Sequence, residues 1–342
     1  MKSKLIVLLA FTLLLTLTAF AADAPKYQVT NRFEVGGDGG WDYLTYDGEA
    51  ARLFITRGTH VQIVDTATGK LLGDIPDLQG VHGVALASDL GIGAISNGKA
   101  NTATLFDLKT LKKTGEVKTG NKPDAILYDP ASHLVFTFNG ASNNTTVIDP
   151  AKAAVVSTID LGGAPEFAVT DKKGHIFVNI EDKNELVEID SAKLAVFAHW
   201  PLTGCDGPTG LALDRKNQRL FSVCANGIMT VLDAVSGKLV ATAPIGKHPD
   251  AAGYDGKAGY AFSSNGDGTL TVIRQETPDK YSVAQTVPTA TGARTLAVDG
   301  KSHTIYLVTA KFGEPPAATA AQPHPRPAML PGSFAVIVVS EK

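Results

Sequence analysis

The sequence lacks the short motifs by which many enzymes are recognised. It contains no Gly-x-Ser-x-Gly nucleophile elbow, no His-Glu-x-x-His zinc motif, no P-loop, no dinucleotide fingerprint and no Cys-x-x-Cys-His haem attachment site. The usual sequence grounds for assigning an enzymatic activity are therefore missing. Whether the protein is an enzyme stays open, and a non-enzymatic role is favoured.

An excess of basic residues is also missing. The formal net charge is −3 for 342 residues, and removal of Lys2 and Lys4 with the N-terminal segment makes it −5. The chain has no basic, aromatic-rich patch either. A general electrostatic grip on nucleic acid is therefore disfavoured, and this includes single-stranded DNA.

The N-terminal segment has the pattern of an export signal. Lys2 and Lys4 precede an apolar run over residues 5–19, and Ala19-Phe20-Ala21 places small residues at the cleavage positions. This predicts a signal peptide over residues 1–21 and a single domain over residues 22–342. The alternative, a transmembrane anchor, is disfavoured because the run is short and small, polar residues follow it. Since no cysteine stands near the cleavage point to carry a lipid, we expect a periplasmic or secreted protein without a stable membrane anchor.

Methionine is scarce, whereas glycine and proline are abundant, with three, 34 and 18 residues respectively. This composition favours many short strands separated by turns over long helices. A short strand that ends in aspartate recurs at Asp65, Asp107, Asp149, Asp190 and Asp233, at intervals of 42, 42, 41 and 43 residues. A fixed period in the low forties with several strands per unit is typical of propeller blades.

Each unit can be divided into four strands, a to d, from the axis to the rim. In the fifth unit we expect them at residues 210–214, 220–224, 229–233 and 239–243. Openings of strand a can be counted seven times, and the seventh unit supplies strands only at 295–298, 304–309 and 333–340. Residues 27–35 can provide its fourth strand and close the ring. The sequence therefore predicts an all-β, seven-bladed β-propeller of four-stranded antiparallel blades, in which an N-terminal strand completes the last blade.

The repeat resembles the YVTN-type β-propeller family of extracytoplasmic proteins. The resemblance rests on aromatic residues in strand b, an Asn-Gly pair after it, and the aspartate of strand c before a Gly-Lys turn such as Gly69-Lys70. It covers essentially the whole mature chain. The chain departs from the family's name motif, because strand b has Phe-Asn or Ser-Asn where the motif has Thr-Asn. Transfer of the fold tolerates this departure, but transfer of an activity does not.

The openings of strand a and the exits of strand b emerge at one mouth of the central channel, the default binding surface of such folds. They bring together a ring of carboxylates, cations and amides: Asp42, Arg57, His82, Asn97, Asp124, Asn139, Glu166, Glu181, Asn226, Asp250, Asn265, Arg294 and Lys311. The alternative is that these residues only satisfy backbone groups in tight turns and that water fills the channel. His82 stands alone among acidic neighbours, which favours a structural or merely polar role for it.

Two functions follow from this ring. The leading hypothesis is a monomeric binding or scaffold module whose small polar ligand or protein partner contacts the channel mouth. The second is a metal-assisted hydrolase, because the related lactonase-like propellers hold a cation with carboxylate and amide ligands around the same channel. In that case a divalent cation such as Ca²⁺ would be held here by Asp124, Asn139, Glu166 and Asp250.

Two further features complete the expectations. Cys205 precedes strand a of the fifth unit and Cys224 ends its strand b, so hairpin geometry returns them to the same side and predicts a disulfide; two buried thiols are the alternative.

A Pro-rich insertion over residues 312–331 interrupts the last unit between strands b and c. Leaving from the exit of strand b, it is equally compatible with a lid over the channel mouth and with a solvated surface loop.

Overall fold

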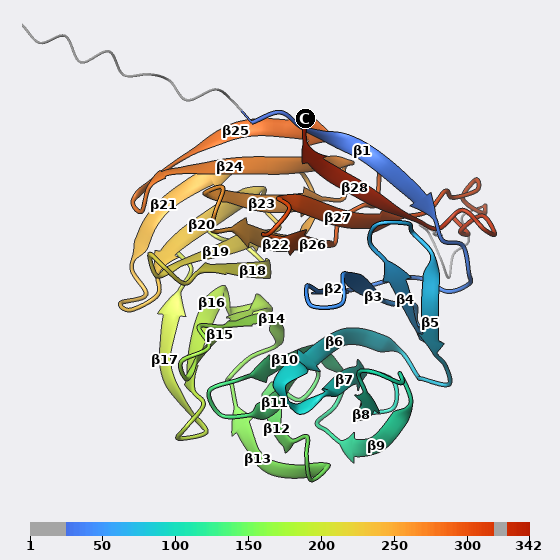
Figure 1. Cartoon of the computed structure of the whole chain (residues 1–342). Coiled ribbons are helices and arrows are strands. Elements are labelled where there is room, and N and C mark those ends of the chain that lie inside the picture. Colours follow the sequence, from blue (N-terminus) through green and yellow to red (C-terminus); the bar gives the residue numbers. More distant parts are fainter. Residues whose placement is uncertain (1–24, 318–326) are drawn as a thin grey trace, which may run out of the picture.

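The repeats fold into seven sheets that are arranged radially around a central axis (Figure 1). The computed structural model describes residues 25–317 and 327–342. Over these residues the strands form seven antiparallel sheets of four strands each. Six sheets use four consecutive strands, and the seventh combines three strands from the C-terminal end with the N-terminal strand. The fold is thus an all-β seven-bladed propeller, as the sequence predicts.

The strands of blades 1 to 4, from the axis outward, have the following bounds. Blade 1 contains β2 (Leu44–Asp47), β3 (Arg52–Thr56), β4 (Val61–Asp65) and β5 (Leu71–Ile75). Blade 2 contains β6 (Val81–Ala87), β7 (Ile92–Asn97), β8 (Thr102–Asp107) and β9 (Lys113–Lys118). Blade 3 contains β10 (Pro123–Asp129), β11 (Leu134–Asn139), β12 (Asn144–Asp149) and β13 (Ala154–Asp160). Blade 4 contains β14 (Pro165–Thr170), β15 (His175–Ile180), β16 (Glu185–Asp190) and β17 (Ala195–Pro201).

The remaining blades follow the same order. Blade 5 contains β18 (Pro208–Asp214), β19 (Arg219–Cys224), β20 (Ile228–Asp233) and β21 (Leu239–Pro244). Blade 6 contains β22 (Pro249–Asp255), β23 (Tyr260–Asn265), β24 (Thr269–Thr277) and β25 (Lys280–Pro288). Blade 7 contains β26 (Leu296–Asp299), β27 (Thr304–Thr309), β28 (Ala335–Glu341) and β1 (Tyr27–Glu34). Two single helical turns, η1 (Ser88–Leu90) and η2 (Glu181–Lys183), occupy connections in blades 2 and 4.

The N-terminal strand closes the ring as predicted. β1 pairs antiparallel with β28, from Tyr27 opposite Glu341 to Glu34 opposite Ala335, and so covers the open edge of blade 7 (Figure 1). Tyr27 also ties this strand to blade 6. Its ring meets Phe262 edge-on at 5.5 Å between centroids, and its backbone N–H and C=O both hydrogen-bond the side-chain amide of Gln285.

Neighbouring blades are held together by apolar contacts between their faces. The Phe54 and Phe106 rings of blades 1 and 2 lie 5.8 Å apart, and the Phe221 and Tyr254 rings of blades 5 and 6 stack at 5.1 Å. One blade alone would expose these faces to water, so the units are stable only when stacked. Within the described residues, no helix is long and apolar enough to cross a membrane.

Polar clamps at the end of strand a add to the apolar contacts. The Tyr254 hydroxyl donates to Asp214 Oδ2 at 3.0 Å, and Thr170 Oγ1 donates to Asp129 Oδ1 at 2.7 Å, in each case from one blade to the preceding one. Asp214 also accepts two backbone N–H groups of its own turn, from Lys216 and Asn217. The aspartates thus order a turn and join two blades at once.

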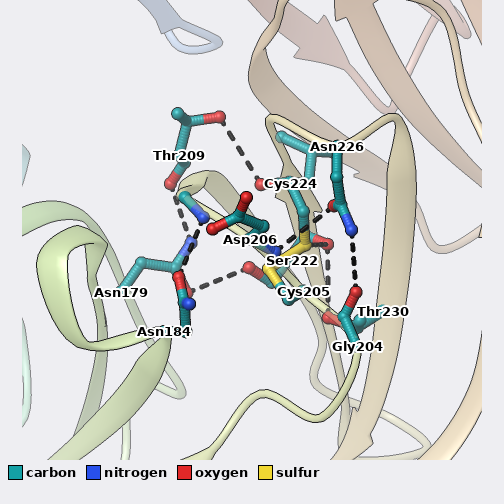
Figure 2. Close-up of a disulfide and its surroundings, with 12 residues drawn as sticks. Asn179, Asn184, Gly204, Cys205, Asp206, Thr209, Ser222, Cys224, Asn226 and Thr230 are labelled. Carbon is teal, nitrogen blue, oxygen red and sulfur yellow. Dashed lines mark hydrogen bonds between the residues drawn. A yellow bond between two sulfur atoms is a disulfide. The ribbon is translucent and has the colours of Figure 1, made fainter.

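The predicted disulfide between Cys205 and Cys224 is present (Figure 2). It joins the β17–β18 connection to the end of β19, with the two Cα atoms 5.4 Å apart. Asn226 supports this connection, because its Nδ2 donates to the Gly204 carbonyl at 2.9 Å and its Oδ1 accepts the Asp206 N–H at 3.3 Å. Asn226 therefore lies at the disulfide loop, where its side chain has a structural role.

Reduction of this disulfide is expected to lower the free energy of unfolding by about 3 kcal/mol, because the bond closes a loop of 19 residues in the unfolded chain. Urea unfolding with and without dithiothreitol measures the difference. A Cys205→Ser/Cys224→Ser double variant is the control, because dithiothreitol should not change its midpoint. A wild-type protein with two free thiols and an unchanged midpoint would contradict the expectation.

Candidate functional site

The acidic residues of the channel mouth stand at the start of strand a. Asp124, Glu166 and Asp250 each follow the proline that opens β10, β14 or β22. Proline lacks an N–H group, so it suits the first position of a strand. An extra residue then interrupts the pairing with strand b in all three blades. Such a bulge re-aims the side chains beside it, and here it lies at the position of the carboxylates.

Three residues from three successive blades meet at this mouth. His82 Nδ1 lies 2.5 Å from Asp42 Oδ2 and 3.4 Å from Asp124 Oδ1. One potential ligand atom from each of the three residues lies within 4.8 Å of the others, which suits a shared cation. Burial lowers the pKa of His82, but the hydrogen bond to Asp42 and the charge of Asp124 outweigh it, so the pKa is raised overall. His82 thus bridges the carboxylates of Asp42 and Asp124.

The charges of this cluster also shift the pKa values of two further carboxyl groups, Glu166 and Asp250. Burial raises the pKa of Glu166 to about 8, and the charges of Asp124 and three other carboxylates add to the effect. Burial likewise raises the pKa of Asp250 to about 6, although Arg294 opposes the shift. Asp42 contributes to both shifts. Carboxyl groups from four blades therefore lie within electrostatic reach of one another.

An aromatic pair spans the channel beside these carboxyl groups, and sequence reasoning missed it. Tyr43 of blade 1 stacks on Phe167 of blade 4, with the ring centroids 5.4 Å apart. Each ring is the chain neighbour of an acidic residue, Asp42 or Glu166. Burial and the charge of Asp124 raise the pKa of Tyr43 well above its ordinary value, so its hydroxyl stays protonated. The pair gives the acidic mouth an apolar wall.

The cations near the mouth compensate only part of its negative charge. Arg294 Nε lies 3.7 Å from Asp250 Oδ2, and Lys122 Nζ lies 3.9 Å from Asp124 Oδ2. Both cations are exposed. Lys311 is exposed as well, and no acidic partner lies beside it within the described ranges. Glu181 is exposed on η2 and contributes further negative charge to Glu166.

The predicted asparagines at the exits of strand b are turned into the sheets. Asn97, Asn139 and Asn265 are buried, and the Nδ2 of each donates to threonine hydroxyls on strand c of the same blade. Asn139 Oδ1 in addition accepts the Thr137 hydroxyl at 3.1 Å. These amides hold strands b and c together. Within the predicted quartet of Asp124, Asn139, Glu166 and Asp250, the amide of Asn139 is engaged inside its blade, whereas Asp124 lies in a cluster with Asp42 and His82.

Arg57 is fully buried and anchors a loop. Its guanidinium donates to the carbonyls of Gly36, Gly37 and Gly39 and to Gln62 Oε1, which uses all five of its N–H donors. Gly36, Gly37 and Gly39 all have positive φ angles, and a Cβ on Gly39 would lie 2.5 Å from the Arg57 carbonyl oxygen. No donor of Arg57 is left for a ligand.

The base of the Pro-rich insertion packs beside the site. Phe312 pairs with Met329, and the Gly313 N–H donates to the Ala328 carbonyl at 2.9 Å. The Phe312 ring lies 6.0 Å from the ring of Trp41, the residue before Asp42. The tip of the insertion, residues 318–326, lies outside the described residues, as does the predicted signal peptide. Neither the lid nor the solvated loop is tested by the base alone.

Neutralising Glu166 is expected to stabilise the protein at alkaline pH. Because folding raises the pKa of Glu166 from 4.5 to about 8, the folded state binds more protons than the unfolded state between these values. This contribution to stability is present below pH 4.5 and is lost as the pH rises through 8. Glu166→Gln should therefore raise the melting temperature at pH 8.5 and leave it nearly unchanged at pH 4. Equal effects at both pH values would contradict the assignment.

Comparison with known proteins supports the fold and goes no further. No protein-family model matches the chain, and no curated protein matches its sequence. Among solved structures, Kuenenia stuttgartiensis hydrazine synthase is similar with a TM-score of 0.70 at 16% identity, over 78% of this chain and 92% of that one. The WD40 repeats of RRP9 are similar with a TM-score of 0.74 at 10% identity, over 93% and 99% of the two chains. The structure of U3-55K has a TM-score of 0.74 at 9% identity, over 91% and 98%. At these identities the likeness concerns the seven-bladed propeller alone.

Proposed function

We propose that this protein is a binding module that holds a positively charged ligand at the acidic mouth of its channel. The observation that carries the proposal is the convergence of Asp42, Asp124, Glu166 and Asp250 from four blades, each within electrostatic reach of the others. Once Glu166 and Asp250 are ionised, Arg294 and Lys122 offset only part of this charge. A bound cation would relieve the repulsion, and the Tyr43–Phe167 pair offers an apolar contact for any carbon attached to it.

The ligand chemistry is either a divalent metal ion or an organic ammonium group. The cluster of Asp42, His82 and Asp124 favours a metal, because two carboxylates and one imidazole form a common set of ligands for divalent transition ions. Metal binding must displace the proton that His82 shares with Asp42. The affinity should therefore rise between pH 5 and pH 8, as this proton and those of Asp250 and Glu166 are lost.

We also propose that the protein is exported. The disulfide and the pattern of residues 1–21 support this, because disulfides persist in oxidising compartments. The resemblance of the repeat to the YVTN-type propellers is consistent with the same location. N-terminal sequencing of the protein recovered from the periplasm or the medium tests it, and a mature chain that retains residues 1–21 would contradict it.

Thermal unfolding with added cations tests the binding proposal. At a hundredfold excess over Kd, Mn²⁺ or Ca²⁺ should stabilise the wild-type protein by about 2.7 kcal/mol, and spermidine should do so if the ligand is an ammonium group. Asp124→Asn should remove the effect. Glu49→Gln is the matched control, because Glu49 is exposed in the β2–β3 turn, at the end of blade 1 opposite Asp42. If neither kind of cation stabilises the wild type, or if Asp124→Asn responds equally, the proposal fails.

A metal-assisted hydrolase of lactones is the second candidate, and the Asp42–His82–Asp124 cluster is the observation that favours it. A metal held there would polarise a carbonyl group. Glu166, whose pKa is raised to about 8, is protonated in most molecules at neutral pH and would supply a proton to a leaving oxygen. Hydrolysis of a lactone panel in the presence of Mn²⁺, lost in Asp124→Asn and in Glu166→Gln, would support it. Cation binding without turnover would support the binding module and exclude the hydrolase.

A further inference from the structure

A cavity lies between blades 4 and 5, at the end of the blades opposite the acidic mouth. Its volume is about 360 Å³, within the range of small-molecule sites. It is lined by residues at the end of β14, the start of β15 and the β20–β21 turn, whereas Glu166 stands at the start of β14. The cavity and the acidic mouth are therefore separate, and the proposed cation ligand does not involve it.

The walls of the cavity are apolar and partly uncovered. Phe177 and Leu213 are buried, but Phe197 on β17 is 61% exposed and Val235 after β20 is 64% exposed. These two are the most exposed of the large hydrophobic side chains that the structure describes. Large apolar side chains exposed at the rim of a concave site mark it as a place where apolar surface is covered by another molecule.

A buried carboxyl group holds a histidine at the cavity. Glu188 on β16 is only 3% exposed, and its Oε1 lies 2.7 Å from His175 Nδ1. Its Oε2 is buried without a hydrogen-bond partner, an arrangement that costs stability. The hydrogen bond at Nδ1 fixes the orientation of the imidazole ring. The other nitrogen, Nε2, makes no hydrogen bond within the described chain. A doubly protonated ring could donate from Nε2 to an anion, and its positive charge would offset the buried Glu188 carboxylate.

Two cations with unused donors complete the lining. Arg215 Nε donates to the Thr170 carbonyl at 2.9 Å, but its two terminal nitrogens make no hydrogen bond within residues 25–317 and 327–342. Lys173 Nζ has no partner there either. The acidic residue beside them, Asp171, is engaged by its own turn, because Oδ1 accepts the N–H groups of Lys173 and His175. The unpaired donors at this cavity thus outnumber the unpaired acceptors.

We propose that this cavity binds a small amphipathic anion, namely a carboxylate that carries an aromatic or branched apolar group. The carboxylate faces the terminal nitrogens of Arg215, which present a planar fork suited to it, and takes further support from Lys173 and His175. The apolar group packs against Phe197 and Val235. Glu188 acts as a positioning residue that orients the His175 ring.

Calorimetric titration of the full mature chain with three probes tests the proposal. 3-Phenylpropionate should bind about tenfold or more tightly than 3-phenylpropanamide, which has the same shape without the charge, and than propionate, which lacks the ring. Equal affinities of the acid and the amide would overturn the anion assignment. The absence of saturable binding of the acid up to about 10 mM would overturn the site.

Variants locate the binding within the molecule. Arg215→Met and Phe197→Ser should each weaken 3-phenylpropionate binding about tenfold. Lys257→Met and Val156→Ser are matched controls, since they remove an exposed cation from the corresponding turn of blade 6 and an exposed apolar side chain from the corresponding outer strand of blade 3. If Arg215→Met lowers the melting temperature, Arg215→Gln replaces it. Unchanged affinity in either cavity variant, or an equal loss in the controls, would refute the site.

Discussion

A chain that begins after residue 35 is expected to lose cooperative unfolding and to aggregate. Without β1, the full length of β28 becomes an open edge, and the contacts of Tyr27 with blade 6 are lost. The ring is then held only by blade-to-blade contacts, with no strand that links its two ends. Circular dichroism melting and size-exclusion chromatography measure the effect, with a chain that begins at Pro25 as the control. The same melting temperature and elution volume for both chains would contradict the closure.

A single side chain should reproduce part of this loss. Tyr27 is 2% exposed, so Tyr27→Ala is expected to cost about 3–5 kcal/mol of unfolding free energy in urea. Tyr27→Phe should be neutral or slightly stabilising, because the Tyr27 hydroxyl is buried without a hydrogen-bond partner. The difference between the two variants separates apolar packing by the ring from any role of the hydroxyl. Equal losses in both would show that the ring is not what anchors β1.

Replacement of Arg57 is the second change with a large expected effect. Arg57→Met should lower the free energy of unfolding by about 4 kcal/mol, because the Gly36, Gly37 and Gly39 carbonyls and Gln62 lose a buried donor together. Arg57→Lys should recover little of this loss, since an ammonium group cannot reproduce the five-donor fork. The Phe334 ring, 3.6 Å from the guanidinium carbon, also loses its cation–π contact.

Lys311 is the matched control for Arg57. Both were predicted from the same strand b position as cations of the channel mouth, but Lys311 is exposed and Arg57 is not. Lys311→Met should therefore change the unfolding free energy by less than about 0.5 kcal/mol. A small loss for Arg57→Met, similar to that for Lys311→Met in the same urea series, would contradict the anchoring role of Arg57.

The fold could be predicted because its information is local and repeated. The aspartates from Asp65 to Asp233 mark one strand end in each of five blades, and the recurring openings of strand a extend the count to seven units. The fifth unit agrees with the prediction within two residues at every strand, since turns and strand chemistry recur there unchanged. The closure by β1 followed from the shortage of one strand in the last blade.

The site could be predicted only in part, because side-chain direction depends on contacts between blades. The openings of strand a placed the acidic residues at one end of the blades, since their position along the chain fixes the end at which they lie. The meeting of His82 with Asp42 and Asp124, however, depends on the radial order of the blades and on the bulges after the opening residues. The asparagines at the exits of strand b do not reach the mouth, because their amides hydrogen-bond threonines of strand c, such as Thr104 and Thr146, inside the sheet.

The convergence of carboxyl groups at the channel mouth is tested most directly by the pKa of Glu166. A pH titration of selectively ¹³C-labelled glutamate carboxyl groups by NMR, with Glu166→Gln to assign the signal, measures it. We expect a pKa of about 8 that falls when Asp124→Asn removes a neighbouring charge. A Glu166 pKa close to 4.5 that does not respond to Asp124→Asn would show that the carboxylates act independently, and the proposed cation site would have no basis.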